Sequence, residues 1–338
     1  MSSDVTIQIP ASTAGRSPRE VDGALHHAAV AAGSAPSIHN TQPWFWRGGR
    51  GVLELWADRS RQLRIGDPAG RMLTISCGCA LHHALVALAA QGQRTTVVPL
   101  PDPTQPDLLA RVTVTGNAAI DAATIRMYDA IALRRTDRRQ AADQPMDEST
   151  MLAIAHAARP HGAFLRFLPP DRIAGLAELV SAAMHAQAAN LAWRAELSQW
   201  VGGTGRSVGV PDANLPSHPV PGPVPERDFG RFGTLPVQDE PAGSPSYAVL
   251  YGEEDTPAGW LCAGQALSAI WLVANELDVS VVPISAVVEV PGTRRGLREL
   301  LYRTSWPYLV LRLGLTDPRE RGPVATARLS ASWTVSDR

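Results

Sequence analysis

The sequence A-P-S-I-H-N-T-Q-P-W, at Ala35–Trp44, is the stretch around which the rest of the chain is organised. A helix-like pattern over 20–32 precedes it, and a strand-like pattern over 51–57 follows it. Pro36 and Pro43 fix their own φ angles and bias the residues before them toward extended backbone. We therefore expect a stiff loop whose backbone N–H groups and short polar side chains can meet the edge of a flat, polar heteroaromatic ligand. The alternative is an ordinary polar loop, since asparagine and proline are common in turns.

Hydrophobic patterning predicts a mixed α+β chain. Stretches 72–91 and 261–277 are apolar nearly all round, which is typical of helices buried in the middle of a domain. Further helices are predicted over 121–133, 148–158, 172–201 and 293–302, and strands over 95–100, 109–115, 163–168, 279–283 and 307–313.

Two short words recur in the two parts of the chain. Gly78-Cys-Ala-Leu and Gly264-Gln-Ala-Leu each open a buried helix, and the word Val-Val-Pro follows each helix. At face value each half, 1–118 and 119–338, is one α+β unit, and the chain is a fused pseudo-dimer. Because the words are short and unequally spaced, a chance match is the alternative.

Composition excludes several classes of function. The 338 residues carry a net charge of −1, with a pI of about 6.8, so we expect no binding to nucleic acid or to a membrane surface. All 31 basic residues are arginine, which excludes a P-loop lysine and Schiff-base chemistry.

The sequence shows no signal-peptide pattern and no uninterrupted membrane-spanning run, and we expect a cytoplasmic protein. The three cysteines match neither a disulfide framework nor a zinc pattern, so no metal is expected.

The 35–44 stretch resembles the flavin-contacting loop of the nitroreductase family, whose members are FMN-dependent oxidoreductases. Three further stretches resemble the Acg-like branch of NAD(P)H nitroreductases: D-P-A-G-R-M-L-T-I-S-C-G-C-A-L at 67–81, L-R-R-T-D-R-R at 133–139, and T-P-A-G-W-L-C-A-G-Q-A-L at 256–267. Together they span most of the chain in the expected order. The resemblance implies a nitroreductase-like α+β fold in which two protomers, here two tandem halves, build each flavin site together.

The two halves carry complementary parts of such a site. The first half has the 35–44 loop but no arginine cluster before its first helix, where Ser17-Pro18-Arg19 is at best a remnant. The second half has R-R-T-D-R at 134–138, but its helix–strand junction at 158–163 reads A-R-P-H-G-A, without the asparagine and the second proline. We infer one composite site, and hence one FMN per chain held between the halves. A monomer can then form the site, because the dimer is fused in the chain.

By this resemblance the cofactor-binding residues fall on four segments. They are Pro36, Ser37, Ile38, Asn40 and Gln42 in the loop, Arg134, Arg135, Thr136 and Arg138 in the cluster, then Pro283, Ile284 and Ser285, and finally Arg328. The resemblance puts Arg134 and Thr136 toward the ribityl phosphate, Arg138 near flavin N1 and O2, and the 283–285 segment near flavin N5. Arg319 and Arg321 compete with Arg328 for the phosphate, and no catalytic residue is assigned. The alternative for the cluster is a solvated helix C-terminus, where the helix dipole favours arginine.

Residues 202–245 are rich in proline and glycine and follow no helical or strand period. A stretch this long without secondary structure is usually a lid, a binding loop or a disordered linker. Its apolar anchors are Leu215, Phe229, Phe232 and Leu235. We expect a lid over the flavin rather than a disordered linker. Within the 35–44 loop, His39 is expected to point to solvent, and a proton donor facing the flavin is the alternative.

Two functions therefore compete. In the first, the protein is an enzyme that takes hydride from NAD(P)H onto FMN and passes it to a nitroaromatic or a quinone. In the second, a lid shields the flavin, and the protein stores or sequesters FMN or senses redox state with little turnover. A scaffold that has lost flavin is a third class, against which the intact loop and arginine cluster argue. The absence of a G-x-G-x-x-G fingerprint does not exclude NAD(P)H, because nitroreductases bind nicotinamide directly over the flavin.

Overall fold

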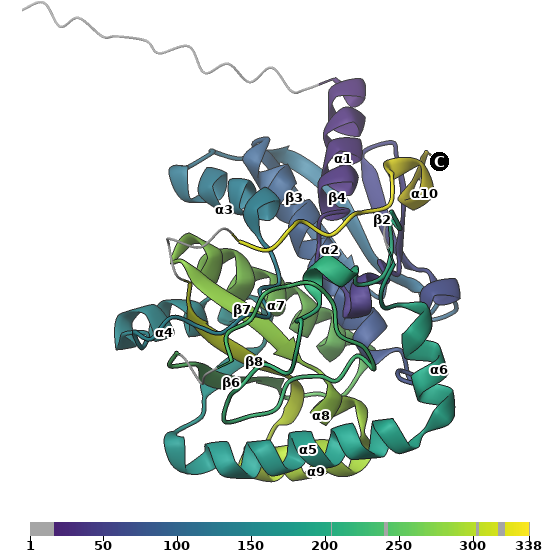
Figure 1. Ribbon diagram of the computed structural model, residues 1–338. Coiled ribbons are helices and arrows are strands. Elements are labelled where there is room, and N and C mark those ends of the chain that lie inside the picture. Colours follow the sequence, from purple (N-terminus) through teal and green to yellow (C-terminus); the bar gives the residue numbers. More distant parts are fainter. Residues whose placement is uncertain (1–16, 204, 240–242, 302–303, 317–321, 338) are drawn as a thin grey trace, which may run out of the picture.

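The computed structural model describes residues 17–203, 205–239, 243–301, 304–316 and 322–337 and shows a mixed α+β protein (Figure 1). Its helices are α1 (Pro18–Ala32), α2 (Arg71–Ala90), α3 (Ala122–Leu133), α4 (Glu148–His156), α5 (Ile173–Ala189), α6 (Leu191–Gln199), α7 (Pro257–Glu276), α8 (Ala286–Glu289), α9 (Pro291–Leu300) and α10 (Ala331–Thr334). Its strands are β1 (Trp44–Gly49), β2 (Val52–Ala57), β3 (Gln93–Pro99), β4 (Leu108–Asn117), β5 (Phe164–Phe167), β6 (Ser246–Gly252), β7 (Val279–Ile284), β8 (Trp306–Leu315) and β9 (Val335–Asp337).

The strands form two sheets with the same internal order. The first sheet runs β3-β4-β2-β1-β9, and the second runs β5-β6-β8-β7. Written from the other edge, the second sheet is β7-β8-β6-β5, which matches β3-β4-β2-β1 strand for strand. All six pairings among these eight strands are antiparallel. Only β9 has no counterpart in the described second sheet: it comes from the C-terminal end of the chain and pairs in parallel with β1.

The two buried helices, α2 and α7, pack against each other at the centre of the molecule (Figure 1). They cross at the two glycines of the repeated word. A Cβ atom on Gly78 would collide with the carbonyl oxygen of Leu261, and one on Gly264 would collide with that of Ile75. Leu261 lies three residues before Gly264 on α7, and Ile75 lies three residues before Gly78 on α2, so the crossing is reciprocal. Glycine is required at both positions because the two backbones touch.

Length and composition alone would allow both central helices to cross a membrane. In α2, however, 89% of the most apolar window is buried inside the protein, and in α7 61% is buried. Most of their buried residues belong to the main hydrophobic core of the described structure, together with the inner faces of both sheets. Their apolar surface is therefore used for packing within the chain.

The structure corrects several predicted elements. The helix predicted over 172–201 is two helices, because the chain breaks at Asn190 and its side chain accepts a hydrogen bond from the Trp193 N–H to cap α6. The strand β6 was not predicted from the sequence, and neither was β9. Residues 1–18 are predicted from the sequence to be a loose lead-in; of these, 1–16 lie outside the described residues, while Ser17 caps α1 and Pro18 begins it.

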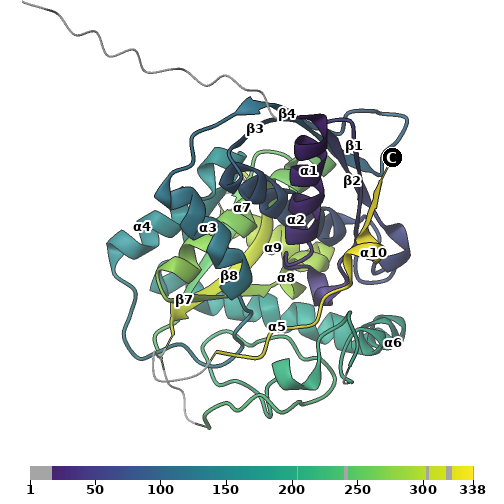
Figure 2. The same cartoon turned by 90° about the horizontal axis from the view of Figure 1, so that it is seen from above.

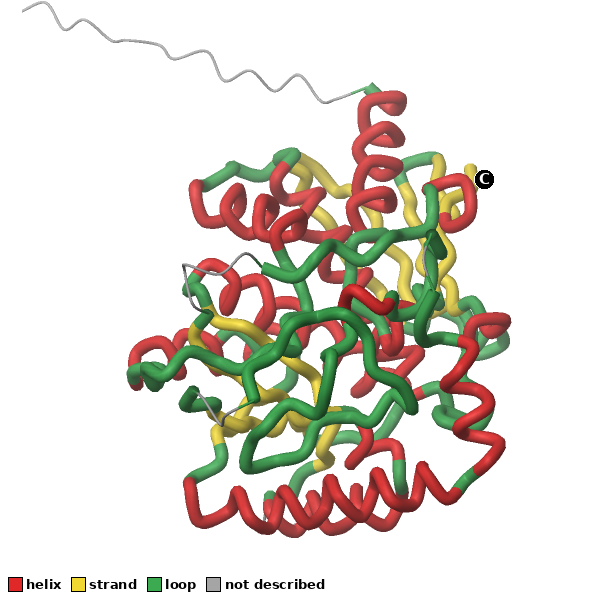
Figure 3. Tube along the Cα trace, viewed as in Figure 1, coloured by secondary structure: helices red, strands yellow, loops and turns green. Residues whose placement is uncertain are grey.

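The 202–245 segment follows α6 and contains one short 3₁₀ turn, Asp212–Asn214, in its described part. It forms the irregular loops that lie over the second half of the molecule (Figure 3). Two predicted anchors are buried, Leu215 fully and Leu235 nearly so. Phe232 was wrongly predicted to be an anchor, since it is 60% exposed. Buried Val210 and Val224 contribute instead, so the described part of the segment is docked on the protein.

Candidate functional site

A cavity of about 370 Å³ lies between the two halves. Its walls come from the 34–40 loop, one face of α2, the end of α3 with residues 134–138, the 202–245 segment, the end of β7, and the C-terminal tail at 324–328. That tail crosses from the second sheet toward the first, as Figures 1 and 2 show. Every predicted cofactor-binding residue except Gln42 lines this cavity: Pro36, Ser37, Ile38, Asn40, Arg134, Arg135, Thr136, Arg138, Pro283, Ile284, Ser285 and Arg328. Arg319 and Arg321 lie outside the described residues.

The 35–44 loop is held in an unusual backbone conformation. His39, Asn40 and Gln42 have positive φ angles of 44°, 55° and 50°, a region that is uncommon for residues other than glycine. The Ser37 hydroxyl accepts a hydrogen bond from the Gln42 N–H at 2.9 Å, and the Ile38 N–H donates to Ser76 on α2 at 3.1 Å. Such conformations persist only where the surroundings enforce them, and they cluster at functional sites.

The amide side chains of Asn40 and Gln42 are engaged with other parts of the protein. Asn40 Nδ2 donates to the carbonyls of Gly209, at 3.0 Å, and Ala327, at 3.1 Å. Gln42 Nε2 donates to the Ser207 carbonyl at 2.7 Å, and its Oε1 accepts from the Leu329 N–H at 2.9 Å. The two side chains therefore fasten the 202–245 segment and the C-terminal tail to the loop. Gln42 is not among the residues that line the cavity, and its predicted cofactor contact stays a prediction.

Arg134, Arg135 and Arg328 form a cluster that has no carboxylate partner among the described residues. Arg134 is 4% exposed, stacks on Trp271 with 4.7 Å from its guanidinium carbon to the ring centre, and leaves Nε and Nη1 without a hydrogen-bond partner in the described structure. Burial and the neighbouring Arg328 lower the pKa of Arg134 to about 9, and burial and Arg135 lower that of Arg328 to about 10. Buried, unpaired guanidinium groups destabilise the protein unless an anion joins them.

The burial of Arg134 excludes the alternative that the whole cluster is a solvated helix end. The polar atoms that it and Arg328 leave free are the donors that a phosphate or carboxylate accepts. The cluster therefore lines the cavity with guanidinium groups that have no carboxylate partner among the described residues.

A second group of arginines, Arg138, Arg227 and Arg312, is balanced by carboxylates. Arg227 pairs with Glu289 at 2.5 Å, and Arg312 lies 2.8 Å from Glu226, measured from Nε to Oε1. Burial lowers the pKa of Arg138 to about 10 although Glu226 opposes the shift, and burial raises the pKa of Glu226. Both Glu226 and Arg227 belong to the 202–245 segment, so this segment brings one charge of each sign into the cavity wall.

His39 was wrongly predicted to face solvent. It is 8% exposed and meets the ring of Phe229 edge-on, with 6.1 Å between ring centres. Burial, together with the charges of Arg227 and Arg138, lowers its pKa well below the ordinary value. The imidazole is thus neutral at physiological pH and can donate or accept one hydrogen bond at the cavity wall.

Sequence reasoning missed the apolar part of the cavity. Its walls are built by two stripes on the central helices, whose members recur at helical spacing: Met72, Ile75, Ser76 and Cys79 on α2, and Leu267 and Trp271 on α7. Periodicity could not have found them, because both helices are apolar all round and no single face stands out.

No family model matches the chain. Crystal structures of nitroreductases with bound FMN from Bacteroides fragilis and Desulfitobacterium hafniense align with TM-scores of 0.38 and 0.36, each at 13% identity. They cover 60% and 59% of this chain, and 94% and 93% of their own.

The curated relatives are nearer. A "Putative NAD(P)H nitroreductase" of Mycobacterium tuberculosis is 36% identical over 284 residues, which is 83% of this chain and 81% of that protein. The "Putative NAD(P)H nitroreductase acg" of the same organism is 28% identical over 302 residues, which is 87% of this chain and 89% of that protein. The chain belongs to the nitroreductase family, in the branch that includes Acg.

Proposed function

We propose that the protein binds one FMN in the cavity between its halves and acts there as an NAD(P)H-dependent oxidoreductase on nitroaromatics or quinones. The observation that carries this proposal is the carboxylate-free cluster of Arg134, Arg135 and Arg328 at one end of a cavity of about 370 Å³. That volume is within the usual range for a small-molecule or cofactor site.

The residues present fit FMN. The three arginines would hold the phosphate, because a guanidinium fork pairs with two phosphate oxygens and is charged at neutral pH. The apolar stripes of α2 and α7 suit a flat ring system, and the 35–38 loop and the 283–285 segment offer backbone groups to its polar edges. Bound FMN would supply hydride transfer between NAD(P)H and the acceptor.

The chain itself would contribute orientation and charge. We propose that Arg138 lies toward the end of the ring where negative charge develops, and a fixed cation there stabilises the reduced state. The 202–245 segment contributes Val210, Asn214, Glu226, Arg227 and Phe229 to the wall. It would act as a lid that excludes water from the site.

We also propose that the chain is a fused pseudo-dimer with a single composite site, so that a monomer suffices. The matching order of the two sheets and the reciprocal glycine crossing support two equivalent halves. The counterpart of the 35–44 loop in the second half is the 158–163 junction, which forms a short 3₁₀ turn. There His161 packs edge-on against buried His82, with 4.8 Å between ring centres.

The docked 202–245 segment favours a second candidate function. Hydrogen bonds and ion pairs link it to the motif loop, β8, α8 and the tail. If it rarely opens, the protein stores or sequesters FMN, or senses redox state, with little turnover.

The FMN stoichiometry of the purified chain tests the main proposal. After reconstitution and gel filtration we expect one non-covalent FMN per chain, measured from flavin absorbance against protein concentration. Two FMN per chain would refute the single composite site. A protein that cannot be loaded with FMN would refute flavin function altogether.

A further inference from the structure

Trp271 on α7 covers one face of the Arg134 side chain. The guanidinium carbon of Arg134 lies 4.7 Å from the centre of the Trp271 ring and over its face. Both residues line the cavity, and they are only 4% and 3% exposed. A cation at this distance is attracted by the negative face of an aromatic ring, most strongly where water is excluded. The ring therefore offsets part of the cost of burying the Arg134 charge.

The stack leaves the edge of the Arg134 guanidinium group open. A guanidinium group is planar and its five N–H donors lie in its plane, so a ring on its face blocks none of them. Arg134 Nη2 donates to the Ser34 carbonyl at 3.4 Å, while Nε and Nη1 have no hydrogen-bond partner in the described structure. Arg328 Nη2 donates to the same carbonyl, also at 3.4 Å. The two guanidinium groups thus meet at one carbonyl, through bonds that are longer than usual and therefore weak.

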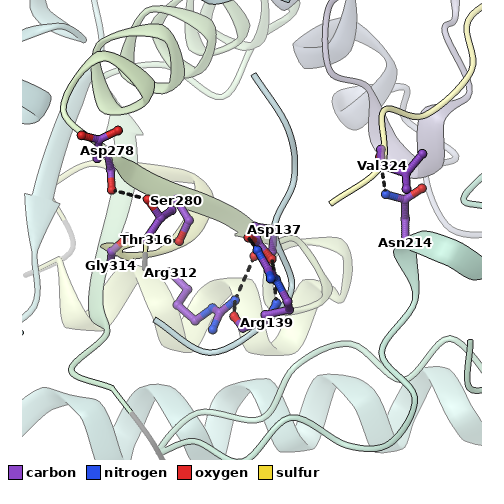
Figure 4. A network of polar contacts seen from close by, with 9 residues as sticks. All are labelled: Asp137, Arg139, Asn214, Asp278, Ser280, Arg312, Gly314, Thr316 and Val324. Atoms are coloured by element: carbon purple, nitrogen blue, oxygen red, sulfur yellow. Dashed lines mark hydrogen bonds and ion pairs between the residues drawn. The ribbon is translucent and has the colours of Figure 1, made fainter. Parts of the chain in front are cut away.

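Arg328 has further supports in the C-terminal tail that carries it. Asn214 Nδ2 donates to the carbonyl of Val324 at 2.7 Å, as Figure 4 shows. Asn40 Nδ2 donates to the carbonyl of Ala327 at 3.1 Å. The tail is therefore fastened on both sides, and the position of Arg328 follows from it.

The side chain of Arg134 lacks such supports. Its long bond to Ser34 is the one hydrogen bond of its guanidinium group in the described structure. The charges of Arg328 and Arg135 act against it. Because like charges repel, this repulsion favours rotamers of Arg134 that lie away from Arg328. The contact with Trp271 opposes that movement.

A second stack of arginine on tryptophan involves the same helix but lies elsewhere. The guanidinium carbon of Arg71 lies 5.0 Å from the centre of the Trp260 ring. Arg71 also pairs with the carboxylate of Asp255, which Arg134 has no equivalent of among the described residues. Neither Arg71 nor Trp260 is among the residues that line the cavity. This stack is complete within the chain and provides a control for the first.

We propose that Trp271 is a positioning residue for the phosphate of the bound cofactor. Its ring holds the guanidinium plane of Arg134 so that the unpaired N–H edge lies beside Arg328, and both groups are in place before the phosphate arrives. This inference rests on the proposed function, in which the cofactor is FMN. A group that is already held in its binding orientation loses less conformational freedom on binding, and the difference appears as affinity.

The test compares FMN with riboflavin, which differ only in the phosphate, so the ratio of their dissociation constants isolates it. Fluorescence titration of the flavin-free full chain gives this ratio for the wild type, Trp271→Phe, Trp271→Met and the control Trp260→Met. Phenylalanine and methionine are similar in size, but only phenylalanine keeps an aromatic face. We expect the preference for FMN to fall about tenfold in Trp271→Met and to stay within about threefold of the wild type in Trp271→Phe. Trp260→Met should match the wild type.

Two results would overturn the proposal. One is an unchanged preference for FMN in Trp271→Met, and the other is an equal loss in Trp271→Phe, since the aromatic face would then not matter. Should Trp271→Met fail to fold, the wild-type chain made with fluorinated tryptophan decides, because fluorine makes the face of the ring less negative. Its preference for FMN must then fall, whereas that of Trp271→Phe made in the same way must not.

Failure of the proposed function is recognised separately, as a wild type that binds neither flavin. The four proteins are then compared by calorimetry with inorganic phosphate as the probe. The same order of affinities is expected, with Trp271→Met the weakest. Any other order, or no binding of phosphate to the wild type, would contradict a role of Trp271 in positioning Arg134.

Discussion

The two halves of the molecule share a sheet order but differ in how their outer hairpin is connected. In the first half, β1 and β2 are joined by the two-residue turn Arg50-Gly51, whose φ angles of 57° and 75° suit a tight type I′ hairpin. In the second half, 168–245 separates β5 from β6 and contains α5, α6 and the 202–245 segment, which lines part of the cavity. The motif loop lies in the first half, at 35–44, and its counterpart at 158–163 is a short turn.

The shared framework therefore does not define the site. Both halves contain equivalent strands and helices. The connections differ in length, so the first half supplies the 35–44 loop and the second half supplies the 202–245 segment. Function in this chain lies in the connections, as is common where one fold carries many activities. The following changes test how far the two halves are equivalent, and where they are not.

The largest effect is expected from removing the long connection. Replacing 202–245 with a short Gly/Ser linker should leave both halves folded, since α2 and α7 lie outside it. A hydride donor must come within about 3–3.5 Å of its acceptor atom, so we expect reduction of the FMN-loaded protein by NADPH to accelerate by roughly a hundredfold if lid opening limits the rate. Stopped-flow absorbance measures this. Equal and fast rates in both proteins would show that the segment is only a linker.

The framework itself is tested at the helix crossing. Gly78→Ala and Gly264→Ala should each destabilise the protein by about 3 kcal/mol, because the added Cβ meets the backbone of the other helix. Urea denaturation measures the free energy of unfolding. Gly23→Ala on α1, where a Cβ would meet nothing within 4 Å, is the matched control and should not destabilise the protein. Strongly unequal losses at the two crossing positions would contradict the reciprocal packing.

The next change tests whether the arginine cluster of the second half contributes to FMN binding. Arg134→Ala should weaken FMN binding by about 1.5–3 kcal/mol, the range for a charged hydrogen bond. Arg159→Ala, at the exposed junction of the same half, is the control and should leave the affinity unchanged. Fluorescence titration of FMN measures both. Unchanged affinity in Arg134→Ala would mean that the cluster does not hold the phosphate.

Arg138→Ala should mainly lower the midpoint potential of the bound flavin. Loss of a cation near the developing charge lowers the flavin midpoint potential by about 30–60 mV for a two-electron couple, if the contact contributes as a charged hydrogen bond does. A dye-equilibration titration of the FMN-loaded variant measures the shift. A potential equal to that of the wild type would place Arg138 away from the reacting end of the ring.

The smallest expected effect is a dependence of stability on pH. The folded-state pKa of Arg134 is lowered to about 9, mainly by burial. Because unfolded Arg134 keeps its proton to higher pH, the FMN-free protein should gain about 1 kcal/mol as pH rises from 8 to 10. Arg134→Met should lack this gain, and loading with FMN should reduce it. Urea denaturation at both pH values tests this, and parallel curves for the wild type and the variant would contradict it.

Much of the framework was predictable because its signals are local. The two apolar stretches at 72–91 and 261–277 became the central helices, and the repeated glycine word marked their crossing. The motif loop and the arginine cluster were also visible, since their prolines and arginines stand out in composition. The prediction for His39 was wrong because its burial depends on Phe229, a residue far away in the sequence.

The α+β class, the family resemblance and the polar residues that line the cavity could be predicted from the sequence, because these depend on short-range periodicity and on local motifs. Only the tertiary structure decided which charges are paired. Asn40 meets Gly209 and Ala327, and Glu226 meets Arg312, across separations that no local pattern encodes. Packing decides whether an arginine has a carboxylate partner within the chain. Burial then sets how strongly an arginine without such a partner is destabilised. That distinction separates Arg134 from Arg138, although the two belong to one short motif.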